Sequence, residues 1–144
     1  ALSGVEIALW DLAAKLHGKP LCQLLRGVGG ASEPRQRLPV YASLMRYSEP
    51  SAVANVCRAV KAAGYSAVKL HEITEEAVAA AREAVGADMK LMVDTNCPWS
   101  PPEARVSSQW MRKYGVYWLE EPIYPPEDFT SLSGKYYSIY QSGC

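Results

Sequence analysis

The feature that most constrains this chain is a repeated unit in which an apolar strand is followed by a helix that stops at a glycine. Capping signals and apolar spacing predict three such helices, at about residues 51–63, 75–85 and 101–114. The glycines that end them are Gly64, Gly86 and Gly115. Ser100, Pro101 and Glu103 give the third helix an N-cap, a proline at its first position and a capping box.

The segments before, between and after these helices have the composition of strands. Their sequences are LPVYASL (residues 38–44), SAVKLH (66–71), KLMVDTN (90–96) and VYWLEEP (116–122). The last three are apolar on both faces until their C-terminal ends turn polar, which is typical of parallel strands covered by helices. Alternating strands and helices leave two architectures open, a doubly wound sheet or a (β/α) barrel, because four strands fit either.

The N-terminal segment is predicted to be one helix followed by a loop. Ser3 and Glu6 form a capping-box pattern, and apolar residues follow at helical spacing until Gly18 and Pro20 end the helix. The stretch after it is predicted to be a loop that contains Gly27, Gly29 and Gly30. Because these glycines do not follow a strand and open a helix, a phosphate-binding loop is not expected.

Composition argues against several classes of function. The 144 residues are 49% hydrophobic and carry 15 Lys plus Arg against 15 Asp plus Glu, as expected of one globular domain. This balanced charge offers no basic surface for nucleic acid or for a membrane. No apolar run approaches the roughly 20 residues that span a bilayer, and no signal peptide is evident, so we expect a cytoplasmic protein.

The cysteines are expected to be free thiols. They are scattered, with no Cys-x-x-Cys pair and no Cys/His spacing of a zinc site: Cys22, Cys57, Cys97 and Cys144. A nucleophilic role for Cys97 would need a base, and none stands beside it in the sequence, so a passive loop thiol is favoured.

Polar residues recur at the strand ends with nearly the period of the repeat. Ser43, Lys69, Asp94 and Glu120 are separated by 26, 25 and 26 positions. This spacing predicts that successive strands present them at one level. In a (β/α) barrel that level is the C-terminal mouth, where active sites of this fold are built.

These residue types suit a metal site with a proton-transfer group beside it. Asp94 and Glu120 are the oxygen ligands that Mg²⁺ prefers, and a third ligand is expected near position 145 or 146, beyond Cys144. Lys69 and His71 lie two residues apart on a strand and so share a face, where either could act as a general base. Taken singly, each has a commoner structural explanation, and it is the shared period that favours a site.

Longer motifs resemble a known family. The segment SGVEIALWDLAAKLHGKPLCQLL resembles the stretch that joins the capping domain to the barrel in the mandelate racemase and muconate lactonizing branch of the enolase superfamily. VKLH, VDTN and WLEEP then resemble its second, third and fourth barrel strands. The resemblance covers roughly residues 1–130, with several motifs in the family's order.

The resemblance implies a partial (β/α) TIM-type barrel made of about the first four β/α units. Residues 1–36 would be the linking helix and loop from a missing capping domain, residues 37–130 the first half of the barrel, and residues 131–144 an atypical tail rich in Ser and Tyr. The family binds Mg²⁺ and abstracts the proton α to a substrate carboxylate, through a metal-stabilised enediolate. An acid-sugar dehydratase, or a racemase or cycloisomerase, is expected.

The resemblance also suggests roles for individual residues. Asp94 and Glu120 match the first two metal ligands, and Asn96 matches the polar neighbour of the first. Lys69 matches the first lysine of a Lys-x-Lys pair, whereas His71 stands where the second lysine, often the base, is expected. Glu121 is expected to contact substrate or to support the neighbouring ligand.

Two alternatives stay open at this stage. The chain could be an inactive fragment or pseudo-enzyme that acts by association with an intact homologue. Two half-barrels could also pair as a homo-oligomer, because a four-stranded piece leaves two parallel edges unpaired. A small doubly wound nucleotide-binding domain is less favoured, since no glycine-rich turn joins a first strand to its helix.

Overall fold

The computed structural model describes residues 2–29 and 37–125. The chain divides into two compact units, Ala1–Pro39 and Val40–Cys144, which are described separately. The predicted tail at 131–144 lies outside the described residues. No helix in the described ranges is long and apolar enough to cross a membrane.

The first unit contains two helices, α1 (Leu2–Leu16) and α2 (Leu21–Gly29). The predicted capping box at Ser3 is wrong, because α1 already includes Leu2 and Ser3 therefore lies within its first turn. The prediction of a loop over Gly27 and Gly29 is also wrong. Each glycine costs a helix roughly 1 kcal/mol. Two features outweigh this cost: the leucines of α2 stand at helical spacing, and the Pro20 carbonyl accepts from the amides of Gln23 and Leu24.

The second unit is a four-stranded parallel sheet with helices between its strands. The strands are β1 (Ala42–Ser43), β2 (Ala67–Leu70), β3 (Lys90–Asp94) and β4 (Val116–Glu120). The helices are α3 (Pro50–Ala62), α4 (Glu75–Val85) and α5 (Pro101–Lys113). These bounds confirm the predicted helices and the last three strands. The first strand is shorter than predicted, because only Ala42 and Ser43 pair with β2.

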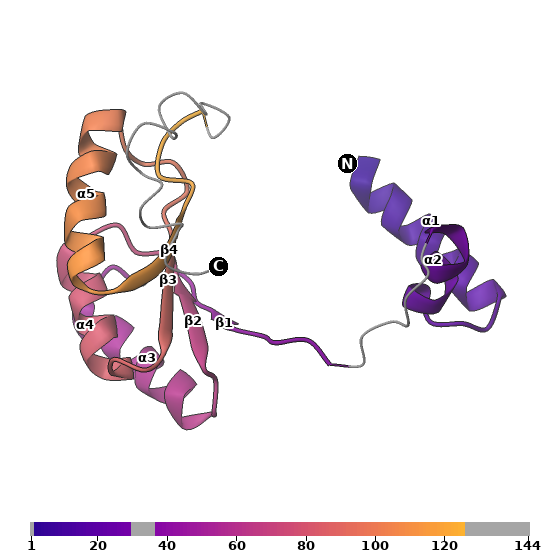
Figure 1. The fold of residues 1–144 in the computed structure, drawn as a ribbon, viewed down its shortest axis with the longest axis horizontal. Helices are drawn as coiled ribbons and strands as arrows, with labels where there is room; N and C mark the ends of the chain where they lie inside the picture. Colours follow the sequence, from indigo (N-terminus) through magenta and orange to yellow (C-terminus); the bar gives the residue numbers. More distant parts are fainter. Residues whose placement is uncertain (1, 30–36, 126–144) are drawn as a thin grey trace. The chain divides into compact units, whose positions relative to one another are not determined.

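The order of the strands separates the two architectures that the sequence left open. The order is β1-β2-β3-β4, and every neighbouring pair is parallel. Figure 1 shows α3, α4 and α5 along the same face of this sheet. A doubly wound sheet reverses its strand order and carries helices on both faces. The sequential order with helices on one face is that of the first units of a (β/α) barrel.

The hydrophobic core lies between the sheet and these helices. Its buried members come from alternate positions of β2, β3 and β4 and from the inner faces of the helices: Val68, Leu70, Leu91, Val93, Leu119, Val53, Cys57, Val78, Ala81, Val85 and Met111. Burial, aided by the charge of Glu72, raises the pKa of the Cys57 thiol to about 11. Cys57 is therefore an inert core residue, whereas the free Cys22 thiol is exposed.

The helix ends follow the local signals closely. Glu103 accepts hydrogen bonds from the Ser100 amide and hydroxyl at 2.8 and 2.6 Å, which fixes the start of α5. These bonds lower the pKa of Glu103. Gly86 and Gly115 have φ of 79° and 60°, a left-handed conformation that glycine adopts without strain.

Arg82 connects two turns at the N-terminal ends of the strands. Its half-buried guanidinium donates to four backbone carbonyls, at 2.7–3.0 Å: those of Gly86, Met89, Tyr114 and Gly115. These carbonyls belong to the turns that lead into β3 and β4, so one side chain holds both turns. Burial lowers the pKa of Arg82 from its ordinary value, although an arginine remains charged.

We predict that Arg82→Met lowers the free energy of unfolding by about 2–3 kcal/mol, because four carbonyls lose a charged donor while the apolar stem is kept. Urea unfolding followed by circular dichroism measures the loss. The matched control is Arg58→Met, since Arg58 is exposed and donates to Asn55 of its own helix. A change within about 0.5 kcal/mol is expected there. Equal losses in the two variants would contradict the role given to Arg82.

Candidate active site

The predicted site residues gather at the C-terminal ends of β2, β3 and β4, but not all at one level. Asp94 and Glu120 are register partners, as are Ser43 and Lys69. Lys69 itself pairs with Met92, two residues before Asp94. The prediction of a single level is therefore wrong for Lys69 and for its partner Ser43, which lie one level before Asp94 and Glu120. Chain spacing adds helix and loop lengths to the strand, and strands of a barrel are staggered, so equal spacing does not fix equal register.

Lys69 reaches the site because its side chain is long. Its Nζ lies 3.2 Å from Asp94 Oδ2 and 3.2 Å from Glu120 Oε2, and only 11% of the side chain is exposed. Burial alone would lower the pKa of Lys69, but the hydrogen bonds and charges of Glu120 and Asp94 outweigh it and raise that pKa. The ammonium also lies 5.9 Å from the centre of the Tyr41 ring.

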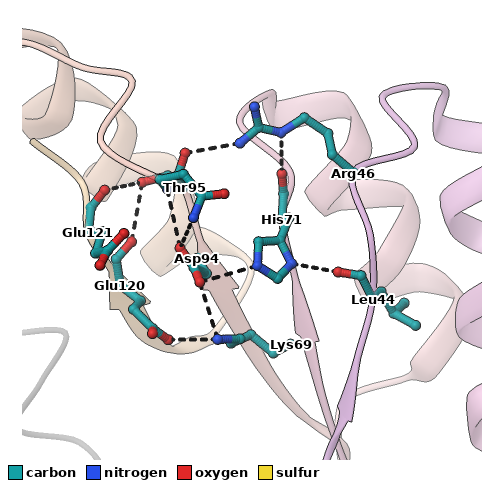
Figure 2. Close-up of polar contacts among 9 residues, drawn as sticks. Leu44, Arg46, Lys69, His71, Asp94, Thr95, Glu120 and Glu121 are labelled. Atoms are coloured by element: carbon teal, nitrogen blue, oxygen red, sulfur yellow. Dashed lines mark hydrogen bonds and ion pairs between the residues drawn. The ribbon is translucent and has the colours of Figure 1, made fainter. Parts of the chain in front are cut away.

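Asp94 is the most heavily bonded carboxylate of the site. Its Oδ2 faces Lys69 Nζ and His71 Nε2, each at 3.2 Å, as Figure 2 shows. Its Oδ1 accepts from the backbone amide and the side-chain amide of Asn96 at 3.2 and 3.1 Å. With a side chain only 8% exposed, this anion is stabilised by the Lys69 ammonium on one oxygen and by the two Asn96 donors on the other.

His71 follows directly after β2 and extends the side-chain row of Lys69. Its Nδ1 lies 2.5 Å from the backbone oxygen of Leu44, on the segment after β1, and its Nε2 faces Asp94. A carbonyl oxygen and a carboxylate oxygen both accept hydrogen bonds and donate none, so each ring nitrogen of His71 faces an acceptor. The ring is therefore held between the segment after β1 and the end of β3.

The turns after β3 and β4 are locked to each other through backbone groups. The Thr95 hydroxyl donates to the Glu121 carbonyl at 2.8 Å, and the Cys97 amide donates to the same oxygen at 2.7 Å. Asn96, Cys97 and Glu121 all have positive φ, between 48° and 57°. Strained backbone of this kind collects at functional sites. The Glu121 side chain is exposed, and its backbone makes these contacts.

The oxygen ligands that these residues offer suit a hard cation, but they are few. Asp94 and Glu120 approach a common positively charged centre, the Lys69 ammonium, so their oxygens converge. Carboxylate oxygens are the ligands that Mg²⁺ prefers, and Mg²⁺ usually keeps several waters beside them. Across residues 2–29 and 37–125, no group of three or more His, Cys, Asp or Glu is placed to hold a metal ion.

Sequence reasoning missed two charged residues beside this site, Arg46 and Glu72. Arg46 donates to the backbone oxygens of His71 and Thr95 at 2.6 and 3.0 Å. Glu72 is buried and accepts from the backbone amides of the segment after β1. The only signal in the sequence is that both are charged residues next to a strand end, which is also typical of solvated loops.

Two family models match the sequence. Residues 51–135 match the model described as enolase C-terminal domain-like, and residues 1–27 match the N-terminal domain of mandelate racemase and muconate lactonizing enzyme. The first match alone covers more than half of the 144 residues. The chain belongs to the mandelate racemase and muconate lactonizing enzyme family. This confirms the family predicted from the strand-end motifs.

Curated relatives of this family member include sugar-acid enzymes. It is 33% identical over 134 residues to the D-galactarolactone cycloisomerase of Agrobacterium fabrum, covering 88% of this chain and 35% of the relative. It is 34% identical over 140 residues to the D-gluconate dehydratase of Thermoproteus tenax, covering 86% of this chain and 27% of the relative. The chain thus spans about a third of the length of these relatives.

Solved structures of the family confirm the partial-barrel fold. The 3,6-anhydro-D-galactonate cycloisomerase from Zobellia galactanivorans superposes with a TM-score of 0.78 and 29% identity, over 99% of this chain and 39% of that one. D-glucarate dehydratase from Agrobacterium tumefaciens, complexed with magnesium, gives a TM-score of 0.72 and 29% identity, over 90% of this chain and 36% of that one.

We predict that Asp94→Asn destabilises this family member more than Glu120→Gln does, by about 3 kcal/mol against about 1 kcal/mol or less. Asp94 is nearly buried and faces two nitrogen groups, whereas the Glu120 side chain is 40% exposed and faces Lys69 alone among the described residues. Urea unfolding in the presence of a chelator measures both losses.

The control for this comparison is Asp88→Asn, which removes an exposed carboxylate before β3. A change within about 0.5 kcal/mol is expected for it. If Asp94→Asn and Glu120→Gln cost the same, Asp94 is not the centre of the ion-pair cluster.

Proposed function

We propose that this chain carries the proton-transfer groups and two metal ligands of a Mg²⁺-dependent enzyme that removes the proton α to a carboxylate. The substrate class is an acid sugar, and the reaction is that of a dehydratase or a cycloisomerase. The observation that carries the proposal is the convergence of Lys69, His71, Asp94 and Glu120 at the C-terminal ends of three adjacent strands. The names of the relatives support the substrate class.

Asp94 and Glu120 would hold the metal ion. When bound, Mg²⁺ supplies Lewis-acid stabilisation of the negative charge that develops on a substrate carboxylate. Asn96 supports this role, because its two donors hold one oxygen of Asp94 and leave the other toward the site. The carboxylates are adjacent in register, so they approach the cation from neighbouring strands.

Lys69 and His71 would have different roles, substrate binding and proton transfer. The Lys69 ammonium is held between two carboxylates, which keeps it charged and suited to binding the carboxylate of a substrate. The His71 imidazole has its Nδ1 against the Leu44 carbonyl, so Nε2, which faces Asp94, is the ring nitrogen that would take the α-proton. A histidine in this place differs from the Lys-x-Lys pair of the family pattern. The group that would accept the substrate proton is then an imidazole ring rather than an amine.

A second candidate is metal binding without turnover, as in an inactive fragment or pseudo-enzyme that associates with an intact homologue. It is favoured by the donor set, because the described residues bring together only two carboxylates for the metal. Two carboxylates hold Mg²⁺ weakly. We expect the chain on its own to bind Mg²⁺ weakly and to show no turnover.

The metal proposal is tested by calorimetric titration of the full chain with Mg²⁺. Binding is expected for the wild type, and a loss of at least about tenfold in affinity for Asp94→Asn and for Glu120→Gln, since each removes one charged oxygen ligand. Asp88→Asn serves as the exposed-carboxylate control and is expected to bind as the wild type does. Unchanged affinity in both site variants would contradict the metal role.

The second arm measures exchange of the α-proton in heavy water, on a panel of acid sugars including galactarate and gluconate. Exchange that is lost in His71→Gln and kept in His17→Gln would show that the chain is active alone and that His71 is its proton-transfer group. Mg²⁺ binding without exchange on any member would favour the second candidate. Exchange that persists in His71→Gln would remove His71 from the role proposed here.

A further inference from the structure

Two aromatic side chains meet on the inner face of the sheet, which is the face opposite α3, α4 and α5. Tyr41 directly precedes β1, and Trp118 lies in β4. Their ring centroids are 6.0 Å apart, and the rings are nearly perpendicular, at 89°. Aromatic pairs favour this edge-to-face arrangement. We call Tyr41 and Trp118 the aromatic brace.

The brace joins the two outer strands of the described sheet. β1 and β4 stand at opposite ends of the order β1-β2-β3-β4. In a flat sheet they would be three strand spacings apart, about 14 Å. Two side chains meet across this distance only if the sheet curves toward them, as the sheet of a barrel does. The contact therefore fastens the curved sheet on its inner face.

A β-bulge in β4 brings Trp118 and Glu120 to this face. The register of β4 against β3 shifts by one residue at Tyr117. Side chains alternate along a strand, so without this extra residue Trp118 and Glu120 would share the face of Val116, which packs in the core. Leu119 takes the core position instead. One bulge thus places a ring of the brace and a carboxylate of the site on the same face.

Lys69 contacts both the brace and the carboxylates. Its Nζ lies over the Tyr41 ring, 5.9 Å from the ring centre, a distance at which an aromatic face attracts a cation. The same Nζ lies 3.2 Å from an oxygen of Asp94 and 3.2 Å from an oxygen of Glu120. A lysine stem is flexible, so an ammonium can reach a carboxylate from several directions. The Tyr41 ring limits these directions because it occupies one side of the stem.

Trp118 makes a second ring contact, within its own strand. Its ring centroid is 5.8 Å from that of Tyr117, with the rings tilted by 41°. The Nζ of Lys90, at the start of β3, lies 4.4 Å from the centre of the Tyr117 ring. Ring contacts therefore run from β3 through β4 to the residue before β1. The brace is held by two strands besides the one that Tyr41 precedes.

We propose that Tyr41 and Trp118 are positioning residues that hold the Lys69 stem in one conformation, with its ammonium between Asp94 and Glu120. Tyr41 acts directly through its ring, and Trp118 acts by holding Tyr41. The further consequence, that the fixed ammonium binds the carboxylate of a substrate, rests on the proposed function. The conformation of Lys69 does not depend on that function and can be measured without metal or substrate.

The test is proton–carbon NMR of the full chain, labelled with carbon-13 at the ε-carbon of lysine, in the presence of a chelator. Lys69→Met identifies the Lys69 signals by their loss. The two ε-protons of a lysine held in one conformation have different surroundings and give two signals, whereas those of a freely rotating stem give one average. In the wild type we expect two resolved Lys69 signals, moved to higher field by the Tyr41 ring.

Tyr41→Leu is expected to merge the two Lys69 signals into one, near the position of an exposed lysine. Tyr41→Phe should keep two signals, because the contact uses the ring and not the hydroxyl. Trp118→Leu should reduce the separation of the signals, since Tyr41 loses its support. Trp118→Phe keeps a ring and should retain most of the separation, and it provides a milder change if Trp118→Leu does not fold.

Two matched controls separate the brace from a general loss of stability. Tyr65→Leu removes a tyrosine of nearly the same exposure as Tyr41, 40% against 41%, from the segment before β2. Trp110→Leu removes an indole from another edge-to-face pair, whose centroids are 6.4 Å apart at 87°. Both controls should leave the Lys69 signals as in the wild type. Far-ultraviolet circular dichroism checks that each variant is folded.

Four results would overturn the proposal. An unchanged pair of signals in Tyr41→Leu would mean that the carboxylates alone hold Lys69, and a single average signal in the wild type would mean that the stem is not held. Loss of the pair in Tyr41→Phe would remove the ring from its role. Equal changes in the brace variants and in the two controls would reduce the effect to general stability.

The outcome is separate from that of the proposed function. Two Lys69 signals that merge in Tyr41→Leu, in a chain that binds no Mg²⁺ and exchanges no proton, would keep the brace and remove the catalytic proposal. Mg²⁺ binding that depends on Asp94, together with Lys69 signals that ignore Tyr41, would do the reverse.

Discussion

The carboxylate of Asp94 is the interaction on which the arrangement of the strand ends depends. One of its oxygens lies 3.2 Å from both Lys69 and His71, and the other accepts two bonds from Asn96. A carboxylate this deeply buried needs donors around it, and they come from β2, from the residue after it and from the turn after β3. The need to solvate one anion thus orders side chains from two strands and a turn.

The two ends of the sheet are stabilised in different ways. At the N-terminal ends, Arg82 binds four carbonyl oxygens of the turns that lead into β3 and β4. At the C-terminal ends, the charged side chains of Lys69, Asp94 and Glu120 bind one another. This division matches the general behaviour of (β/α) barrels, in which one end carries stability and the other chemistry. The chain contains both ends of its four strands, so both devices can be studied in it.

Predictions from the sequence were correct for features that repeat along the chain and wrong for features that depend on a single contact. The helices ending at Gly86 and Gly115 and the strands carrying Lys69 and Asp94 were predicted, because burial and capping follow the period of the fold. The register of Lys69 relative to Asp94 was not predicted, since register depends on the stagger between strands. Arg46 and Glu72 were missed for another reason. Their partners are backbone atoms of a distant segment, and such contacts have no sequence pattern.

Arg46 and Glu72 hold the backbone on either side of the segment pair that carries His71. A lysine there would act as a charge on a flexible stem and could find its partner from several directions. An imidazole has two distinct nitrogens in a rigid ring, and only one of them can face Asp94 at a time. A ring at the strand ends therefore needs its orientation fixed by its surroundings. The Leu44 carbonyl contacts the ring, and Arg46 binds the backbone oxygen of His71, so both constraints come from the segment after β1.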